Sequence, residues 1–198
     1  MMKKQWLMLI AAAMLVLGGC QNNDSASEPA SVTPSQHEQA ADDSDKNMDQ
    51  MDEMHHSGSG EVPAGLKEAA NPAFKVGSQA IIEAGHMKGM KGAKATIVGA
   101  YDTTAYAVSY TPTTGGPKVT NHKWVIHEEI ENAGAEPFKP GDEVVLEADH
   151  MPGMKGAKAT IDSAEKTTVY MVDYEPTTGG DPVKNHMWVT GSELSAAK

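Results

Sequence analysis

The stretch AKATIVGAYDTTAYAVSYTPTTGG, residues 93–116, decides the fold because the chain contains it twice. The second copy, AKATIDSAEKTTVYMVDYEPTTGG, spans residues 157–180. In the first copy, residues 93–100 and 106–110 have the composition and the period-two alternation of β-strands. The PTTGG segment that follows is typical of a loop, since glycine adopts positive φ freely. Each copy therefore predicts two strands followed by a turn.

The repeat extends outward in both directions from this stretch. Residues 74–130 align on 138–194 without a gap, and 33 of the 57 positions are identical. Apolar residues at 76–84 and 124–126 predict two more strands, and residues 128–130 predict a short final turn. Four or five short strands in each copy favour an all-β fold of two tandem small SH3-like barrels, with a β-sandwich fragment as the alternative. Cores of this size are marginal alone, so the two copies could pack together.

The N-terminus has the organisation of an export signal. Lys3 and Lys4 precede an apolar run at 7–17 that is too short for a comfortable membrane span. The sequence LGGC at 17–20 resembles the bacterial lipobox, in which the cysteine receives a diacylglycerol and becomes the first mature residue. A plain secretory peptide and a signal anchor are the alternatives. Cys20 is the only cysteine, so disulfides and thiolate metal sites are excluded from the domains.

An acidic spacer separates the signal from the repeats. Residues 21–70 carry eleven Asp and Glu against two Lys and have almost no Val, Leu or Ile. Such a composition cannot bury enough apolar surface to offset chain entropy, so we expect disorder. The predicted organisation is a signal peptide at 1–19, the spacer at 20–70, and repeat domains at 71–134 and 135–198. We expect the mature protein to be lipid-anchored at the outer face of the cell membrane.

What the chain lacks excludes one class of function and leaves a second class with little support. The formal net charge is -11 and the sequence contains no Arg, so the basic face needed for nucleic-acid recognition is missing. Catalysis has little support, since Ser109 becomes Asp173 and Asp102 becomes Lys166 in the second copy, and no zincin motif occurs. The expectation is a protein that is not an enzyme.

Methionine and histidine gather in three short clusters. One lies in the spacer and two lie in equivalent loops of the repeats: Met48, Met51, Met54, His55 and His56; His86, Met87 and Met90; His150, Met151 and Met154. Thioether sulfur and imidazole together favour Cu(I) over hard ions. The histidines of the spacer would bind Cu(II) or Zn²⁺ as readily. The loop methionines could instead fill gaps in a small core.

A second histidine recurs in each copy, in the motif Asn-His-x-Trp. His122 is followed by Lys123, whereas His186 is followed by Met187. A lone histidine near an aromatic is more often a hydrogen-bonded structural residue than a ligand. Recurrence beside another histidine raises the alternative that His86 and His122 meet across the end of a barrel and bind metal.

The repeated pattern FxxG…HMxGMKGAxATI…TTxYxVxYxPTTGGxxVxNHxWV resembles the family of YdhK-type lipoproteins, which carry a tandem repeated domain of unknown function. The resemblance covers residues 74–194, and the lipobox and the Met/His spacer match the family's layout. It implies a small barrel fold and similarity to the copper-resistance lipoprotein CopL. It also implies metal contacts in the loops at 86–90 and 150–154, with a site requiring Met187 only in the second copy.

The leading hypothesis is a surface-exposed lipoprotein that sequesters Cu(I) by equilibrium binding and supports copper tolerance. Its expected partners are the membrane, through the lipid at Cys20, the copper-export machinery and the cell wall. The alternative is a non-catalytic cell-envelope-binding module, in which exposed aromatic side chains dock wall peptides or glycans. The aromatics it would use are Trp124, Trp188, Tyr110 and Tyr174.

Overall fold

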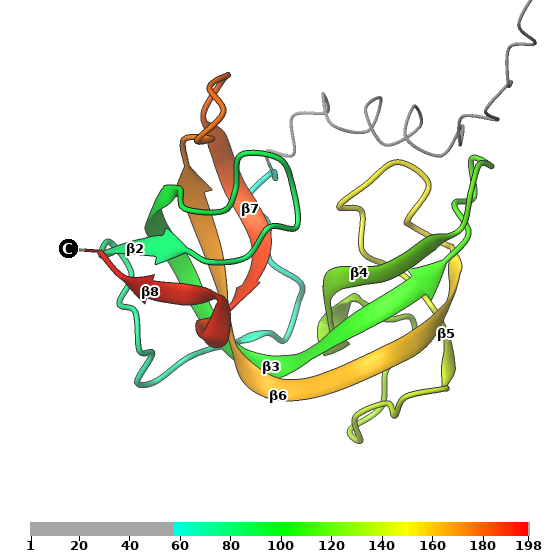
Figure 1. Cartoon of the computed structure of the whole chain (residues 1–198). Coiled ribbons are helices and arrows are strands. Elements are labelled where there is room, and N and C mark those ends of the chain that lie inside the picture. Colours follow the sequence, from blue (N-terminus) through cyan, green and yellow to red (C-terminus); the bar gives the residue numbers. More distant parts are fainter. Residues whose placement is uncertain (1–57, 198) are drawn as a thin grey trace, which may run out of the picture. The chain divides into compact units, whose positions relative to one another are not determined.

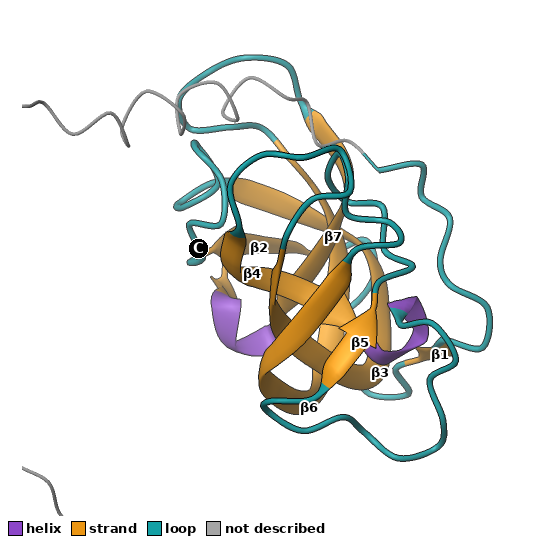
Figure 2. Cartoon of the chain, turned by 90° about the vertical axis from the view of Figure 1, so that its right-hand side faces the viewer, coloured by secondary structure: helices purple, strands orange, loops and turns teal. Residues whose placement is uncertain are grey.

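The structure is a computed structural model that describes residues 58–197. Within these residues the regular structure is β, apart from two single-turn 3-10 helices (Figure 2). The elements are β1 (Lys67–Glu68), β2 (Gln79–Ile82), β3 (Lys94–Tyr110), β4 (Val119–Ile126), η1 (His127–Glu129), β5 (Glu143–Val145), β6 (Lys158–Tyr174), β7 (Val183–Thr190), η2 (Gly191–Glu193) and β8 (Leu194–Ala196). The predicted all-β class and the two repeats are confirmed.

The two longest strands connect the halves of the molecule. β3 and β6 are each 17 residues long and pair antiparallel along nearly their whole length. Thr103 lies opposite Thr167, and these two residues are equivalent positions of the repeats. A residue that faces its own copy relates the repeats by a pseudo-twofold axis, as in an isologous dimer interface. In Figure 1 the pair runs as one curved ribbon beneath both halves of the fold.

Each half, here called a lobe, takes its buried core from both repeats. Lobe 1 combines β2 and the first half of β3 with the second half of β6, β7 and β8. Lobe 2 combines the second half of β3 and β4 with β5 and the first half of β6. A third group of buried side chains, the central cluster, consists of Ala105, Ala107, Trp124, Ile126, Val169, Met171 and Trp188.

Alternation along β3 directs its two faces into different cores. Tyr106, Val108 and Tyr110 enter the core of lobe 2, whereas Ala105 and Ala107 pack in the central cluster. Large side chains therefore fill one core and small ones allow close packing on the other face. The two faces of β6 are divided in the same way. Tyr170, Val172 and Tyr174 enter the core of lobe 1, whereas Val169 and Met171 pack in the central cluster.

The strands predicted at 93–100 and 106–110 are one continuous strand. The polar segment 101–105 between them shows no alternation, yet it pairs with residues 165–169 of the other repeat. The partner that pairs with the whole of this segment comes from the second copy, whereas β1 and β4 pair with only parts of it. A pattern within one copy does not contain that information.

The sequence repeats and the packing units do not coincide. The predicted domain bounds, 71–134 and 135–198, divide the chain into its two copies, but each core mixes both. Pairing within a copy and pairing between copies would bury the same apolar positions. The periodicity is therefore equally compatible with either arrangement.

The two sequence blocks that the repeats share meet across the repeats. Thr177 N–H donates to the Gly89 carbonyl (2.8 Å), and Thr113 N–H donates to the Gly153 carbonyl (2.9 Å). Gly89 has a φ of 76°, and a Cβ built on it would lie 2.5 Å from Thr178 Oγ1. Only glycine suits both the positive φ and this close approach. The HMxGM loop of each repeat is thus fixed by the PTTGG loop of the other.

Candidate functional site

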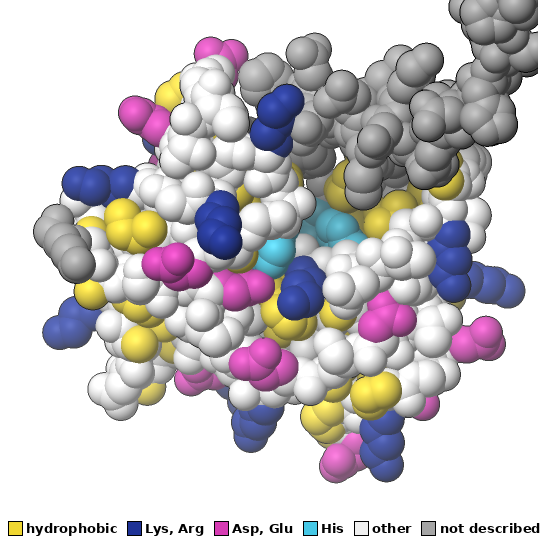
Figure 3. All heavy atoms as spheres, viewed as in Figure 1, with side chains coloured by type: hydrophobic (Ala, Val, Ile, Leu, Met, Phe, Trp, Pro, Cys, Tyr) yellow, Lys and Arg dark blue, Asp and Glu magenta, His cyan; other side chains and the backbone are white. Residues whose placement is uncertain are grey.

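A large open cleft of about 2260 Å³ is lined by residues of both lobes. Figure 3 shows histidine side chains gathered in a hollow of the surface. Side chains come from β4, from β7 and from the loops after β2 and β5. The predicted ligands that line the cleft are His86, Met87, His122, His150, Met151, His186 and Met187. The fold therefore collects thioethers and imidazoles that are far apart in the sequence.

His122 and His186 reach the cleft from irregular stretches of β4 and β7. The strand pairing shifts its register on both sides of each histidine. The preceding residues, Asn121 and Asn185, each have a φ of 51°, a left-handed conformation that asparagine tolerates better than most residues. Irregular pairing of this kind re-aims side chains, which explains why an Asn precedes His122 and His186.

A buried tyrosine stands behind each of these histidines. The ring centroids are 6.0 Å apart for Tyr110 and His122, and 5.8 Å apart for Tyr174 and His186, both edge-on. Burial raises the pKa of Tyr174 to about 12 and also raises that of Tyr110. Both phenols are therefore neutral at physiological pH, and they present uncharged walls to the imidazoles.

A carboxylate in lobe 1 is held by two residues of the other repeat. Glu193 Oε1 lies 2.8 Å from His86 Nε2, and Trp124 Nε1 donates to Glu193 Oε2 at 2.8 Å. The Thr190 N–H donates to Oε2 as well, at 3.0 Å. Both carboxylate oxygens are thus engaged at the edge of the cleft.

Lobe 2 repeats this arrangement with the roles of the repeats exchanged. Glu129 Oε1 lies 2.7 Å from His150 Nε2, and Trp188 Nε1 donates to Glu129 Oε2 at 3.1 Å. The Ile126 N–H donates to Oε2 at 3.0 Å. We call these two His–Glu–Trp groups the cross-repeat clamps, since each joins one repeat to the other.

The clamps also determine how two cleft histidines present themselves. Burial alone would raise the pKa of Glu193, but a hydrogen bond and a charge interaction with His86, together with hydrogen bonds from Thr190 and Trp124, lower it to about 2. With the carboxylate charged, Nε2 of His86 carries a proton, and a neutral ring keeps its lone pair on Nδ1. Nδ1 of His86 and of His150 is buried and has no hydrogen-bond partner among the described residues. A carboxylate on one ring nitrogen is the usual second partner of a metal-binding histidine.

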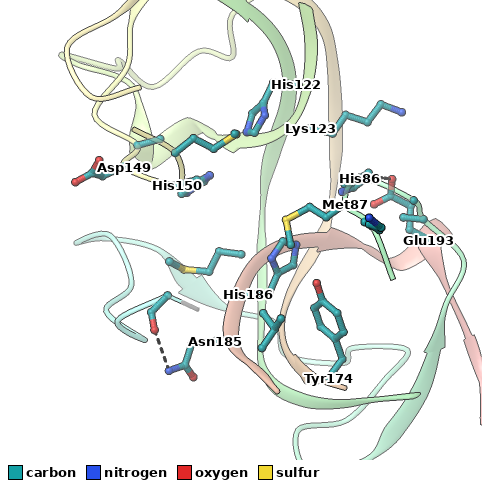
Figure 4. A pocket seen from close by; sticks show the side chains of 18 of the residues that line it. His86, Met87, His122, Lys123, Asp149, His150, Tyr174, Asn185, His186 and Glu193 are labelled. Carbon is teal, nitrogen blue, oxygen red and sulfur yellow. Dashed lines mark hydrogen bonds and ion pairs between the residues drawn. The ribbon is translucent and has the colours of Figure 1, made fainter. Parts of the chain in front are cut away.

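The methionines of the two loops separate into two kinds. Met90 and Met154 are fully buried in the cores of lobes 1 and 2, where they fill space as the alternative interpretation of the sequence held. Met87 and Met151 line the cleft instead. In Figure 4 the Met87 side chain points toward the His186 ring. Within one HMxxM motif, the first methionine faces the cleft and the second belongs to the core.

The two histidines of one repeat lie in different lobes. His86 belongs to the clamp of lobe 1 with Glu193, whereas His122 packs on Tyr110 of lobe 2. In the alternative drawn from the sequence, His86 and His122 meet at the end of one barrel, whereas here they belong to different lobes and line a shared cleft. The cause is that each lobe combines half of one repeat with half of the other. Lobe 1 therefore holds His86 of the first repeat together with His186 of the second, and Tyr174 packs against the His186 ring.

The aromatic residues expected to dock the cell envelope are not exposed. Trp124 and Trp188 pack in the central cluster, and Tyr110 and Tyr174 lie in the lobe cores, each at most 6% exposed. The tandem small barrels would need these rings on the surface to bind wall polymers. The structure removes that basis for the envelope-binding alternative.

Sequence reasoning missed Glu129 and Glu193. The two glutamates occupy equivalent positions of the repeats, 64 residues apart. This identity was the one signal in the sequence that could have marked them as functional. A short acidic turn is ordinarily solvated, so identity between copies did not distinguish it. Only the exchanged packing places each glutamate against a histidine of the other copy.

Several predicted residues lie outside the described residues: Cys20, Met48, Met51, Met54, His55 and His56. Across residues 58–197, no helix is both long and apolar enough to cross a membrane. Among those same residues, no group of three or more His, Asp or Glu side chains is placed to hold a metal ion.

Comparison with known proteins matches both repeats to one family. The family described as "Protein of unknown function (DUF1541)" matches residues 76–127 and 140–191. A Bacillus subtilis (strain 168) relative, "Uncharacterized protein YdhK", is 60% identical over 188 residues, which cover 95% of this chain and 86% of the relative.

Solved structures of the same relative are similar to this chain. A 2.00 Å crystal structure of YdhK from Bacillus subtilis is 69% identical, with a TM-score of 0.71, and covers 73% of this chain and 99% of that one. A solution NMR structure of the YdhK C-terminal domain is 71% identical, with a TM-score of 0.60, and covers 62% of this chain and 93% of that one.

Proposed function

Since the chain belongs to the DUF1541 family, whose function is unknown, we propose an activity from its own residues: it is a lipid-anchored extracytoplasmic protein that sequesters Cu(I). Sequestration is an equilibrium process without turnover, and the protein is not an enzyme. Cys20 carries the lipid and holds the protein at the outer face of the membrane. Copper bound there cannot enter the cell, which supports copper tolerance. This is the role that the resemblance to the copper-resistance lipoprotein CopL implies.

The observation that carries the proposal is the donor set of the cleft. Three thioethers and four imidazoles line one surface: Met87, Met151, Met187, His86, His122, His150 and His186. Soft sulfur with imidazole favours Cu(I), whereas hard ions prefer carboxylate and water oxygens. Two of the imidazoles also keep a buried ring nitrogen with no hydrogen-bond partner among the described residues.

The fold assigns these donors to two equivalent groups. Met87, His86 and His186 belong to lobe 1, and their counterparts in lobe 2 are Met151, His150 and His122. Glu193 and Glu129 orient one histidine in each group from the second ring nitrogen. The histidines also accept Cu(II) or Zn²⁺, so the oxidation state of bound copper depends on the surroundings.

The decisive experiment compares the two methionines of each HMxxM loop. The mature chain is titrated anaerobically with Cu(I) against a competing chelator, alongside Met87→Leu/Met151→Leu and Met90→Leu/Met154→Leu. We expect the first double variant to lose bound copper, with affinity falling about tenfold or more per site. The second should bind like wild type, because leucine replaces core methionine with little change in volume.

Two results would overturn the proposal. One is a wild-type chain that fails to compete for Cu(I), and the other is an equal response of the two double variants. The lipid anchor is tested separately: Cys20→Ser should release the protein from membranes, and a variant that remains membrane-bound contradicts the anchor.

A further inference from the structure

The six methionines among residues 58–197 divide equally between the cleft and the buried cores. Three line the cleft and are half-buried: Met87, Met151 and Met187. Three are at most 2% exposed and pack in the two lobes and the central cluster: Met90, Met154 and Met171. Solvent in the cleft therefore reaches the first set of thioethers, the cleft methionines, and not the second.

A single backbone turn separates the two kinds of methionine in each HMxxM motif. The Met90 N–H donates to the Met87 carbonyl at 3.2 Å, and the Met154 N–H donates to the Met151 carbonyl at 3.1 Å. Across this turn the second side chain enters a core, whereas Figure 4 shows the Met87 side chain pointing toward the His186 ring in the cleft. Each repeat thus carries an accessible thioether and a protected one three residues apart.

The sulfur of a thioether is both a soft metal ligand and an oxidisable group, because one of its lone pairs serves in either reaction. With hydrogen peroxide, the lone pair attacks one peroxide oxygen, the O–O bond breaks and an S–O bond forms. The sulfur gives up two electrons, the peroxide is reduced to water, and no further reactant is needed. The resulting sulfoxide presents a polar oxygen in place of the soft donor.

The place of each methionine determines what its oxidation does to the fold. A sulfoxide at Met90 or Met154 would bury a polar group among the apolar side chains of a core. A sulfoxide at Met87 or Met151 can extend its oxygen into the open cleft, where water solvates it. Oxidation of the cleft methionines therefore changes the donor atoms and leaves the packed cores intact.

We infer that Met87, Met151 and Met187 form a methionine oxidation site, at which peroxides convert the thioethers to sulfoxides and end Cu(I) binding while the fold persists. The effect on copper rests on the proposed function, since only a chain that binds Cu(I) can lose it by oxidation. The cleft imidazoles are retained and still accept Cu(II) or Zn²⁺. Methionine sulfoxide reductases reverse the change with a dithiol, which becomes a disulfide as the oxygen leaves in water.

The oxidation test uses the mature chain with Met48→Leu/Met51→Leu/Met54→Leu, so that no thioether of the spacer reacts. The metal-free protein is treated with hydrogen peroxide, and peptide mapping by mass spectrometry follows the oxygen gained at each methionine. The cleft methionines should be oxidised while the buried three stay reduced. In urea all six should react alike, because buried groups react only when the structure opens. Equal reaction in the folded chain would overturn the site.

The copper test compares the same protein before and after oxidation, once catalase has removed the peroxide. In anaerobic competition with a Cu(I) chelator, the oxidised chain should bind at least about tenfold more weakly, since losing a group that merely orients a metal ligand already costs that much. Reductases with a dithiol should restore the affinity. Methyl signals of Met90 and Met154 should stay unchanged throughout, because the cores remain packed.

Matched variants assign the loss of copper to the cleft methionines. Met90→Leu/Met154→Leu keeps the cleft methionines, so oxidation should weaken its Cu(I) binding as in the parent chain. Met87→Gln/Met151→Gln/Met187→Gln imitates the polarity of the sulfoxide, so it should bind weakly without any oxidant. It should also remain folded, because these side chains line the cleft.

The outcomes separate this inference from the proposed function. An unoxidised chain that binds no Cu(I) defeats the function and the effect on copper together, whereas the oxidation pattern still decides the site. A chain that binds Cu(I) equally well after its cleft methionines are oxidised overturns the effect on copper and leaves copper binding standing. Loss of binding with shifted Met90 and Met154 signals assigns the loss to unfolding and also overturns the inference.

Discussion

Lobe 1 and lobe 2 are built from the same parts in opposite combination, and they differ mainly at the rim of the cleft. Their clamps have nearly the same geometry, with histidine-to-glutamate distances of 2.8 and 2.7 Å. At the rim, Met187 lies beside Gly58, whereas Lys123 takes the equivalent position in the first repeat and lies over the Trp124 ring. The clamp residues are identical between the repeats, whereas Lys123 and Met187 at the rim differ.

This contrast separates the frame of the molecule from its binding surface. The frame consists of the long strands, the clamps and the contacts between the shared loops, all of which need both repeats. A change in the frame must suit both repeats at once, whereas a change at the rim affects one side of the cleft alone. The predictions below test how equal the two halves of the frame are.

The largest effect is expected from separating the repeats. The second repeat alone, residues 135–198, contains half of each core, so a monomer would leave large apolar surfaces in water. We expect it to be unfolded when dilute and to form a symmetric dimer when concentrated, as measured by sedimentation equilibrium. A folded monomer would show that one repeat can satisfy its own core.

Removing the charge of either clamp should destabilise the whole chain. Glu129→Gln and Glu193→Gln each weaken hydrogen bonds to a histidine and a tryptophan, at an expected loss of about 1–3 kcal/mol in the free energy of unfolding. The side chain of Glu129 is 6% exposed and that of Glu193 is 15% exposed, so the first substitution should be the more costly. Urea denaturation measures both, and the reverse order would contradict the role of burial.

The contacts between shared loops offer a matched pair of glycines. Gly89 and Gly92 both have positive φ, 76° and 80°, but a Cβ on Gly89 meets Thr178 and Pro176, whereas one on Gly92 has nothing closer than 4.0 Å. Gly89→Ala should therefore lower unfolding free energy by about 1–2 kcal/mol more than Gly92→Ala. Equal losses would mean that the backbone conformation alone matters.

The smallest effect is a dependence of apo-protein stability on acid pH. The pKa of Glu193 is about 2 when folded, against an ordinary value of 4.5. Its contribution is complete above pH 4.5 and is lost as pH falls toward 2, because the unfolded chain takes up the proton first. Partial exposure reduces the effect to about 1 kcal/mol. Thermal unfolding from pH 6 to 2 should show a shallower decline for Glu193→Gln, and parallel curves would contradict this.

The sequence predicts the class of fold and its repeated units, but not their exchange. Alternation at Tyr106 to Tyr110 marks a strand because one face is large and the other small, whichever copy supplies the partner. The polar segment 101–105 has no such signal, and it is extended because it pairs with residues 165–169 and, over fewer residues, with β1 and β4. Partner choice depends on long-range packing, which a pattern of period two does not record.

The sequence predicts which residue types make up the candidate site, but not which individual residues face the cleft. Met87 and Met90 stand in one motif with the same soft donor, and only packing sends the second into a core and the first to the cleft. The sequence did not indicate Glu193 as a partner of His86, because the two residues are more than a hundred positions apart and neither stands in a recognisable motif with the other. Residue chemistry indicates which donor atoms are available, whereas the fold selects which of them face the cleft.

The exchanged halves also set the order in which the chain can become structured. Tandem domains usually fold one after another as they emerge from synthesis, the N-terminal one first. Here β2 near the start of the first repeat pairs with β8, close to the C-terminus. The core of lobe 2 needs residues up to Ile161 and that of lobe 1 needs residues up to Leu194. The first repeat therefore leaves half of each core exposed until the second repeat appears. The first strands of the chain, such as β2, therefore reach their final packing only when the last strands, such as β8, are present.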